Sequence, residues 1–122
     1  MPARLAFISI ISVVILLVGC DGPVSEGNPD RGKAAIRAFG CGACHEIAGI
    51  RGAVGRVGPP LIAIGRQAYI AGILPNTPTN LRAWMQNPPA IAPNTAMPNL
   101  GITPDQARDI AAYLYTLRGS WP

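Results

Sequence analysis

The clearest helical pattern in the chain lies near its C-terminus. Its apolar positions recur every three or four residues and are Ala107, Ile110, Ala111, Leu114 and Leu117. Thr103 can cap this segment, Pro104 suits the first helical position, and Gln106 completes a capping box with Thr103. The pattern therefore predicts a helix that begins at Pro104 and buries one face.

A second helix is predicted over residues 29–39. Asn28 can cap it, Pro29 suits its first position, and Gly40 can end it. Farther along the chain we expect a short helix over residues 67–74.

A third strong helix signal follows Thr77, which can cap a helix that starts at Pro78. Its apolar face has the spacing i, i+3, i+4 and consists of Leu81, Trp84 and Met85. Pro88 and Pro89 end this helix. Residues 88–104 contain five prolines, so we expect neither a helix nor a central strand there. Because no segment alternates convincingly between apolar and polar residues, the sequence predicts an all-α fold with long Gly/Pro-rich loops.

The start of the chain has the pattern of an export signal. Arg4 supplies a positive charge, and an apolar run interrupted only by two serines covers residues 5–18. At roughly 14 residues, this run is shorter than the length of about 20 that a membrane-spanning helix needs. We therefore expect residues 1–19 to be a signal peptide, with an uncleaved N-terminal anchor helix as the alternative.

The sequence Leu17-Val18-Gly19-Cys20 resembles a bacterial lipobox. The resemblance implies cleavage before Cys20 and a diacylglycerol on its sulfur, with residues 20–28 as lipid anchor and flexible tether. Lipidation would also account for the third cysteine of an exported chain. The expected location is the outer, periplasmic face of the cytoplasmic membrane. An ordinary signal peptide with an unrelated cysteine is the alternative.

Charge and composition argue against a nucleic-acid-binding protein and favour a small domain that is stabilised by a cofactor. The 122 residues carry a formal charge of +4, and without Arg4 nine basic and six acidic side chains leave +3. This mild, scattered charge suits an acidic protein partner or anionic lipids and argues against nucleic-acid binding. With 14 Gly and 13 Pro in the chain, a domain over residues 29–122 would bury a thin core and would gain from a large apolar cofactor.

Cys41-Gly42-Ala43-Cys44-His45 has the Cys-x-x-Cys-His spacing of a covalent haem attachment site. Two thiols at this spacing can add to the two vinyl groups of one porphyrin, and the histidine then reaches the iron. A thioredoxin-like dithiol would need alternating strands and helices, which the pattern lacks. A zinc site would need four ligands, but outside the lipobox the chain has only these two cysteines and one histidine. We therefore expect one haem c per chain, bound through Cys41 and Cys44.

His45 is the only histidine of the chain, so it is the expected proximal iron ligand, and bis-histidine ligation within one chain is excluded. The sixth iron position must then hold methionine, another weak donor, water or nothing. Met85 lies on a predicted helix face and is expected in the core. Met97 lies in an irregular, proline-flanked segment that can hold a weak thioether near the iron, so it is the expected distal ligand.

With these pieces in order, residues 28–118 resemble class I c-type cytochromes. The resemblance implies the cytochrome c fold, with about four helices around one covalently bound haem. It also implies that Gly32 and Ile36 stand where the N-terminal helix crosses the C-terminal helix, opposite Tyr113 and Leu114.

The resemblance extends to further residues of the haem site. The segment Gly58-Pro59-Pro60-Leu61 resembles the one whose proline carbonyl accepts the N–H of the proximal histidine, which implies that Pro59 orients His45. Pro60 departs from the polar residue that is commoner there. Arg66 is implied as a partner of a haem propionate, and Trp84 as an aromatic residue that packs beside the haem.

Residues 72–81, together with Trp84, Asn87-Pro88 and Met97-Pro98, resemble the cytochrome c domain of subunit II of some bacterial haem-copper oxidases. The resemblance implies a one-electron carrier of a respiratory chain, not itself an enzyme, that donates to a terminal oxidase or serves as a haem subunit of a respiratory complex. A gas-binding or peroxidase-like haem protein with a displaceable sixth ligand is the alternative.

Overall fold

The computed structural model describes residues 26–119 and is mostly helical, as predicted. Its elements, in chain order, are α1 Pro29–Ala38, η1 Cys41–Ala43, η2 Ile64–Arg66, β1 Tyr69–Ile70, β2 Leu74–Pro75, α2 Pro78–Gln86, α3 Pro88–Ile91 and α4 Pro104–Thr116, where η marks a single 3-10 turn. The predicted signal peptide and the lipidation of Cys20 lie outside the described residues. Within residues 26–119, no helix is long and apolar enough to cross a membrane.

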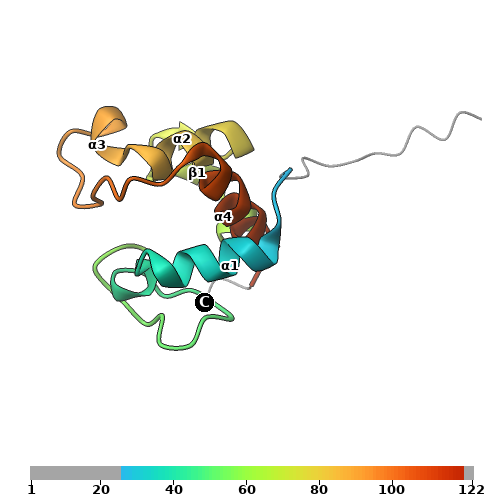
Figure 1. The fold of residues 1–122 in the computed structure, drawn as a ribbon. Helices are drawn as coiled ribbons and strands as arrows, with labels where there is room; N and C mark the ends of the chain where they lie inside the picture. The colour runs from blue at the N-terminus through green and yellow to red at the C-terminus, as the bar shows by residue number, and fades with distance from the viewer. Residues whose placement is uncertain (1–25, 120–122) are drawn as a thin grey trace, which may run out of the picture.

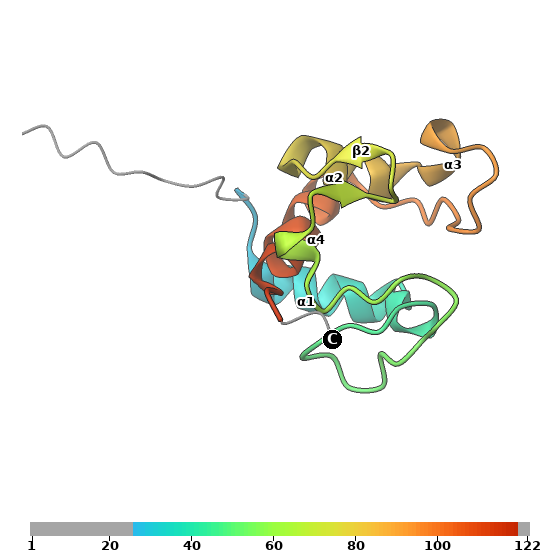
Figure 2. The same cartoon turned by 180° about the vertical axis from the view of Figure 1, so that it is seen from behind.

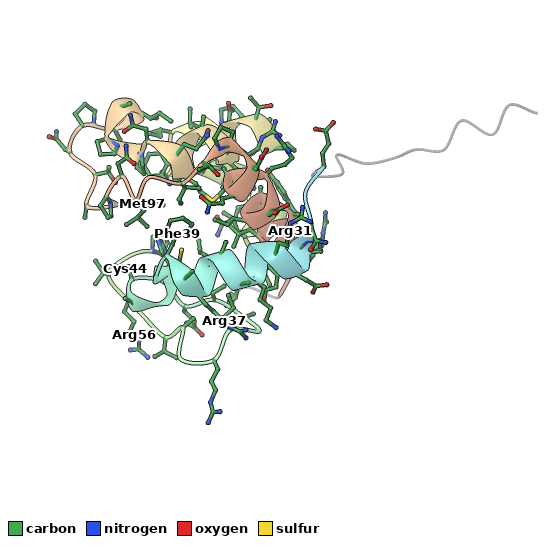
Figure 3. The ribbon with its side chains drawn as sticks, in the orientation of Figure 1. Arg31, Arg37, Phe39, Cys44, Arg56 and Met97 are labelled. Carbon is green, nitrogen blue, oxygen red and sulfur yellow. The ribbon has the colours of Figure 1, made fainter. Side chains whose placement is uncertain are left out.

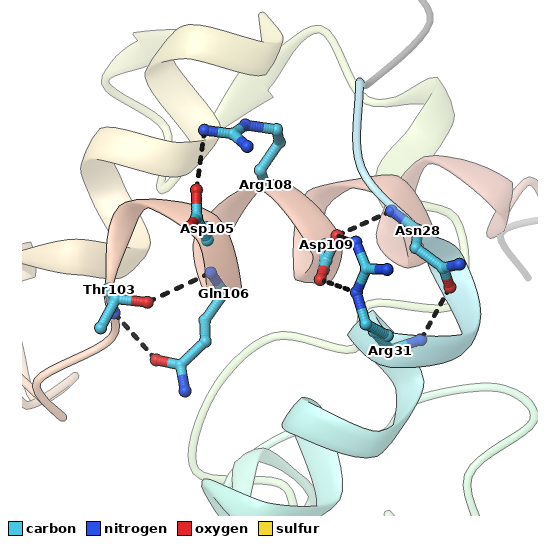
Figure 4. Close-up of polar contacts among 7 residues, drawn as sticks. All are labelled: Asn28, Arg31, Thr103, Asp105, Gln106, Arg108 and Asp109. Carbon is cyan, nitrogen blue, oxygen red and sulfur yellow. Dashed lines mark hydrogen bonds and ion pairs between the residues drawn. The ribbon is translucent and has the colours of Figure 1, made fainter.

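The three long helices start where their capping residues predict. The side chain of Asn28 accepts a hydrogen bond from the backbone N–H of Arg31 at 3.0 Å, and Thr77 caps α2 in the same way. At the start of α4, Thr103 and Gln106 form both hydrogen bonds of a capping box, at 3.0 and 3.3 Å (Figure 4). These bonds satisfy backbone groups that a helix start would otherwise leave unpaired.

Helices α1 and α4 cross at very close range. A β-carbon at Gly32 would collide with the backbone carbonyl of Asp109, so only glycine permits this approach. Ile36 and Ile110 are both 1% exposed and fill the space beside the crossing. The predicted crossing is therefore present, with its closest contact at Asp109, one helical turn before Tyr113.

The other elements lie on two sides of α4 (Figures 1 and 2). We call α1, η1 and the loop over residues 44–61 the attachment side, because it carries Cys41, Cys44 and His45. We call the hairpin β1–β2, α2, α3 and residues 92–102 the methionine side, because it carries Met97. Helix α4 contacts both α1 and α2, and a single buried apolar cluster joins the two sides.

The prediction of a short helix over residues 67–74 is wrong. This stretch forms the antiparallel hairpin β1–β2, in which Ile70 pairs with Leu74. The turn between the strands places Ala71 and Gly72 at φ angles of 51° and 72°, which no right-handed helix allows. The backbone N–H of Ile73 donates to the carbonyl of Ile70 at 3.0 Å and closes the turn.

The prediction that residues 88–104 contain no helix is also wrong for the first four residues of this stretch. Residues Pro88–Ile91 form α3, a single helical turn. Both prolines occupy the first two helical positions, where a backbone N–H would have no helical partner and its absence costs nothing. The rest of this stretch is irregular, as the prolines predict.

Candidate functional site

The Cys-x-x-Cys-His motif forms a tight turn directly after α1. Gly40 adopts a φ of 69°, and the turn η1 follows at once. The backbone N–H groups of Cys44 and His45 both donate to the carbonyl of Cys41, at 3.2 and 3.0 Å. Both cysteines are free and half-buried, so their sulfur atoms are available for two thioether bonds.

The ring of His45 has a defined orientation. Its Nδ1 lies 2.7 Å from the carbonyl oxygen of Pro59, which is the contact that the sequence resemblance implies. A carbonyl can only accept, so Nδ1 carries the proton and Nε2 is left with a lone pair for a metal. A β-carbon at Gly58 would meet three atoms of the His45 ring, and the N–H of Gly58 donates to the carbonyl of Cys44 at 2.8 Å. The backbone of residues 58–59 therefore packs directly against the ring.

The glycine-rich loop after the motif folds back onto it through backbone hydrogen bonds. Gly55 N–H donates to the carbonyl of Gly42 at 3.1 Å, and Leu61 N–H donates to that of Glu46 at 2.8 Å. The α-carbon of Ala53 lies so close to Gly42 that a β-carbon at Gly42 would have no room. The loop supports the motif from one side and brings Pro59 to His45.

Met97 lies on the methionine side, opposite the motif. Figure 3 shows it on the segment that faces Phe39 and Cys44. Its side chain is half-buried against the core, and its backbone N–H donates to the hydroxyl of Thr95 at 3.2 Å. Met85, in contrast, is 5% exposed and lies in the core, as expected.

Half-buried apolar side chains from both sides of α4 pack against the core. They include Phe39, Cys41, Leu61, Leu74, Ile91 and Met97. No polar or charged residue among residues 26–119 is buried. Burial in these surroundings raises the pKa of the Cys41 thiol. The chemistry of this set suits a flat apolar group with two thioether bonds, and the residues therefore fit a haem.

The zinc alternative finds no support in the same region. The described residues contain no group of three or more His, Cys, Asp or Glu that could hold a metal ion.

The two remaining predicted site residues lie on different elements. Arg66 is exposed at the end of η2, and its contact with a haem propionate stays a prediction. Trp84 is 8% exposed, and its side chain packs in the buried apolar cluster. Its contact with a haem also stays a prediction.

Two tyrosines of α4 were not predicted as site residues, and each reaches a loop beside the site. The hydroxyl of Tyr113 donates to the carbonyl of Ala48 at 2.7 Å, and that of Tyr115 donates to Oδ1 of Asn76 at 2.8 Å. Both contacts join residues that lie far apart in the sequence, so no local pattern could have indicated them.

Comparisons with known proteins agree with this geometry. The family model for cytochrome c matches residues 29–118. Cytochrome c oxidase subunit 2 of Alkalihalophilus pseudofirmus is 29% identical over 98 residues, which are 77% of this chain and 27% of that protein. The chain thus spans about a quarter of the length of this relative.

A solved structure shares the fold. A chain of SoxXA from P. pantotrophus superposes with a TM-score of 0.61 at 22% identity, over 76% of this chain and 83% of that one. The predicted cytochrome c fold and the predicted haem c are therefore confirmed. The chain belongs to the cytochrome c family, whose members bind haem c covalently and transfer electrons.

Proposed function

We propose that this protein carries single electrons in a membrane-bound respiratory chain, with His45 and Met97 as the two axial ligands of its haem iron. When bound, the haem supplies a reversible ferric/ferrous couple. The observation that supports the proposal is that Met97 lies on the segment that faces Cys44 (Figure 3), the residue before His45, whose Nδ1 lies 2.7 Å from the Pro59 carbonyl.

Each residue of the motif has a separate task in this proposal. Cys41 and Cys44 hold the porphyrin by thioether bonds. His45 offers Nε2 to the iron, and the Pro59 carbonyl fixes its tautomer and ring plane and makes the imidazole a stronger donor.

Met97 supplies the weaker ligand. A thioether stabilises ferrous iron relative to ferric iron, so the potential of the carrier rises. With His45 and Met97 as ligands, a small molecule would have to displace one of them to bind the iron, which favours outer-sphere electron transfer over gas binding or peroxide chemistry.

A haem-copper oxidase is the proposed electron acceptor, and the chain acts either as a free carrier or as a haem subunit of the complex. The likeness to cytochrome c oxidase subunit 2 supports this choice. The chain carries a net positive charge, which suits brief docking on an acidic partner surface.

We further propose that the protein is exported and tethered to the periplasmic side of the cytoplasmic membrane through lipidated Cys20. Mass spectrometry of the membrane-extracted protein tests this. The expected N-terminus is Cys20 with a diacylglycerol, and a Cys20→Ala variant should leave the membrane fraction. An intact leader or an unmodified Cys20 would refute the proposal.

Absorption spectroscopy of the holoprotein tests the ligand set. The spectrum of the ferric form is recorded with and without cyanide, and that of the reduced form with and without carbon monoxide. The sulfur-to-iron charge-transfer band of methionine ligation should be present, and ligand binding should be slow. Met97→Ala should abolish the band and lower the potential, whereas Met85→Leu should leave both unchanged because Met85 is 5% exposed and lies in the core. A high-spin spectrum with rapid carbon monoxide binding would identify a gas-binding or peroxidase-like protein instead.

A further inference from the structure

The side chain of Asn76 ties three parts of the chain together. Its Nδ2 donates to the carbonyls of Ile64 and Gln67, both at 2.8 Å, and its Oδ1 accepts from the hydroxyl of Tyr115 at 2.8 Å. Its backbone N–H donates to the carbonyl of Ala68 at 2.9 Å. Both amide hydrogens of the side chain are thus in use, and all of these partners belong to segments outside α2.

This network lies where the chain passes from the attachment side to the methionine side. Ile64 begins the turn η2 and Gln67 follows it, Asn76 precedes α2, and Tyr115 lies in the last turn of α4. The hydroxyl of Tyr115 therefore holds Asn76 on α4, and the side-chain amide of Asn76 in turn holds the turn η2.

Two further contacts press the same turn against the end of α4. The N–H of Gly65 donates to the carbonyl of Leu117 at 3.0 Å. A β-carbon at Gly65 would lie 2.6 Å from the carbonyl oxygen of Tyr115, so the two backbones are in close contact. The turn η2 is thus held against α4 by its own backbone contacts and, through Asn76, by the hydroxyl of Tyr115.

The hairpin between η2 and Asn76 contains an unfavourable backbone conformation. Ala71 has a φ of 51°, and it is the one non-glycine residue with positive φ among residues 26–119. A left-handed conformation is costly for alanine and persists where the surrounding structure enforces it. The bonds of Asn76 to Ala68 and to Gln67 hold the two ends of this hairpin together and supply that constraint.

We infer that Asn76 and Tyr115 are positioning residues, which fix the start of the methionine side on η2 and on α4, the helix that both sides share, and thereby fix the geometry of the haem site. Ile70 and Leu74, which the network holds in place, contribute a buried and a half-buried apolar side chain to the cluster beside the site. For the position of Met97 opposite His45, the inference rests on the proposed ligand set. For the packing of the hairpin on the apolar cluster, the inference does not depend on that ligand set.

The Tyr115→Phe variant of the holoprotein tests the inference, because it removes one hydroxyl and keeps the ring. Hydrogen exchange at the amides of residues 64–76 should become about five times faster, the effect expected for one neutral hydrogen bond. The midpoint potential should fall, because water that reaches the haem stabilises the ferric form. Exchange within α4 should stay unchanged.

Tyr113→Phe is the matched control, since it removes the other tyrosine hydroxyl of α4. Its bond goes to Ala48, so its exchange effect should be confined to the loop after the motif. The Asn76→Ala variant should resemble Tyr115→Phe with a larger effect, and the double variant should add little to it.

A merely structural role predicts a different result. If Tyr115→Phe lowers global stability but leaves the potential and the exchange of residues 64–76 at wild-type values, the inference is wrong. The wild-type charge-transfer band separates this test from the ligand proposal. Its absence would refute Met97 as ligand, whereas the exchange and potential of Tyr115→Phe would still decide the role of the network.

Discussion

Asp109 accepts two hydrogen bonds from the guanidinium group of Arg31, at 2.7 and 3.0 Å, across a separation of 78 residues (Figure 4). The backbone N–H of Asn28 donates to the same carboxylate at 2.7 Å. The carboxylate therefore fastens the start of α1 to the middle of α4. The bond from Arg31, together with that from Asn28, lowers the pKa of Asp109, and the bond to Asp109 raises the pKa of Arg31.

The first prediction concerns the stability of the protein in acid. A lowered pKa in the folded state means that Asp109 stabilises the fold above its unfolded pKa of about 3.9 and loses this effect as the pH falls through the lower folded value. Asp109→Asn should therefore unfold more readily than wild type at pH 7, and the difference should shrink below about pH 4. Thermal unfolding at both pH values measures this.

Asp105→Asn is the control for the acid experiment. Its side chain is 84% exposed and pairs only with Arg108, three residues away in the same helix. Such an exposed pair contributes little. A pH dependence as large in Asp105→Asn as in Asp109→Asn would contradict the prediction.

Gly32→Ala should destabilise the protein by about 1–3 kcal/mol, since the added methyl group must separate α1 from α4. Denaturant unfolding of the holoprotein gives the free energy. Ala34→Ser on the exposed face of the same helix should cost much less. Equal losses in the two variants would show that the helix crossing tolerates a wider spacing.

Gly58→Ala should disturb the histidine ligand. The added methyl group meets the ring of His45, so the ring must leave the Pro59 carbonyl. We expect a lower yield of haem-bound protein and an altered ring N–H signal in nuclear magnetic resonance spectra of the ferrous form. Val57→Ala should have neither effect, because Val57 is 74% exposed. A wild-type N–H signal in Gly58→Ala would argue against a close fit.

Thr103→Ala should lower the free energy of unfolding by about 1 kcal/mol, because α4 loses its N-terminal cap. For a domain of this size, that loss shifts the melting temperature by about 4–8 °C. Thr79→Ala in α2 is a suitable control, since its hydroxyl makes only a 3.4 Å contact with Arg82. An unchanged melting temperature in Thr103→Ala would indicate that water replaces the cap.

The long helices could be predicted because their signals are local. The caps at Asn28, Thr77 and Thr103 act within three residues, and a proline follows each of them. The hairpin over residues 69–75 could not be predicted in this way. Its turn puts an alanine at positive φ, which local preference opposes, and the bonds around Asn76 that help to hold the hairpin depend on the fold of distant segments.

For the candidate site as for the fold, the features that depend on neighbouring residues could be predicted. The motif from Cys41 to His45 is contiguous, so its spacing alone indicates haem attachment. The Pro59 contact became visible through the family resemblance. The hydrogen bonds of Tyr113 and Tyr115 to Ala48 and Asn76 were missed because they join residues far apart in the sequence and depend on how α4 packs.

The crossing of α1 and α4 has a consequence for how the chain folds. The first and last helices contact each other, so nearly the whole domain forms one large loop that must close before either helix is buried. Such contacts between distant segments slow folding and make it cooperative. A chain that ends before Asp109 therefore lacks the partner of its own N-terminal helix, and α4 must be present before the domain can become stable.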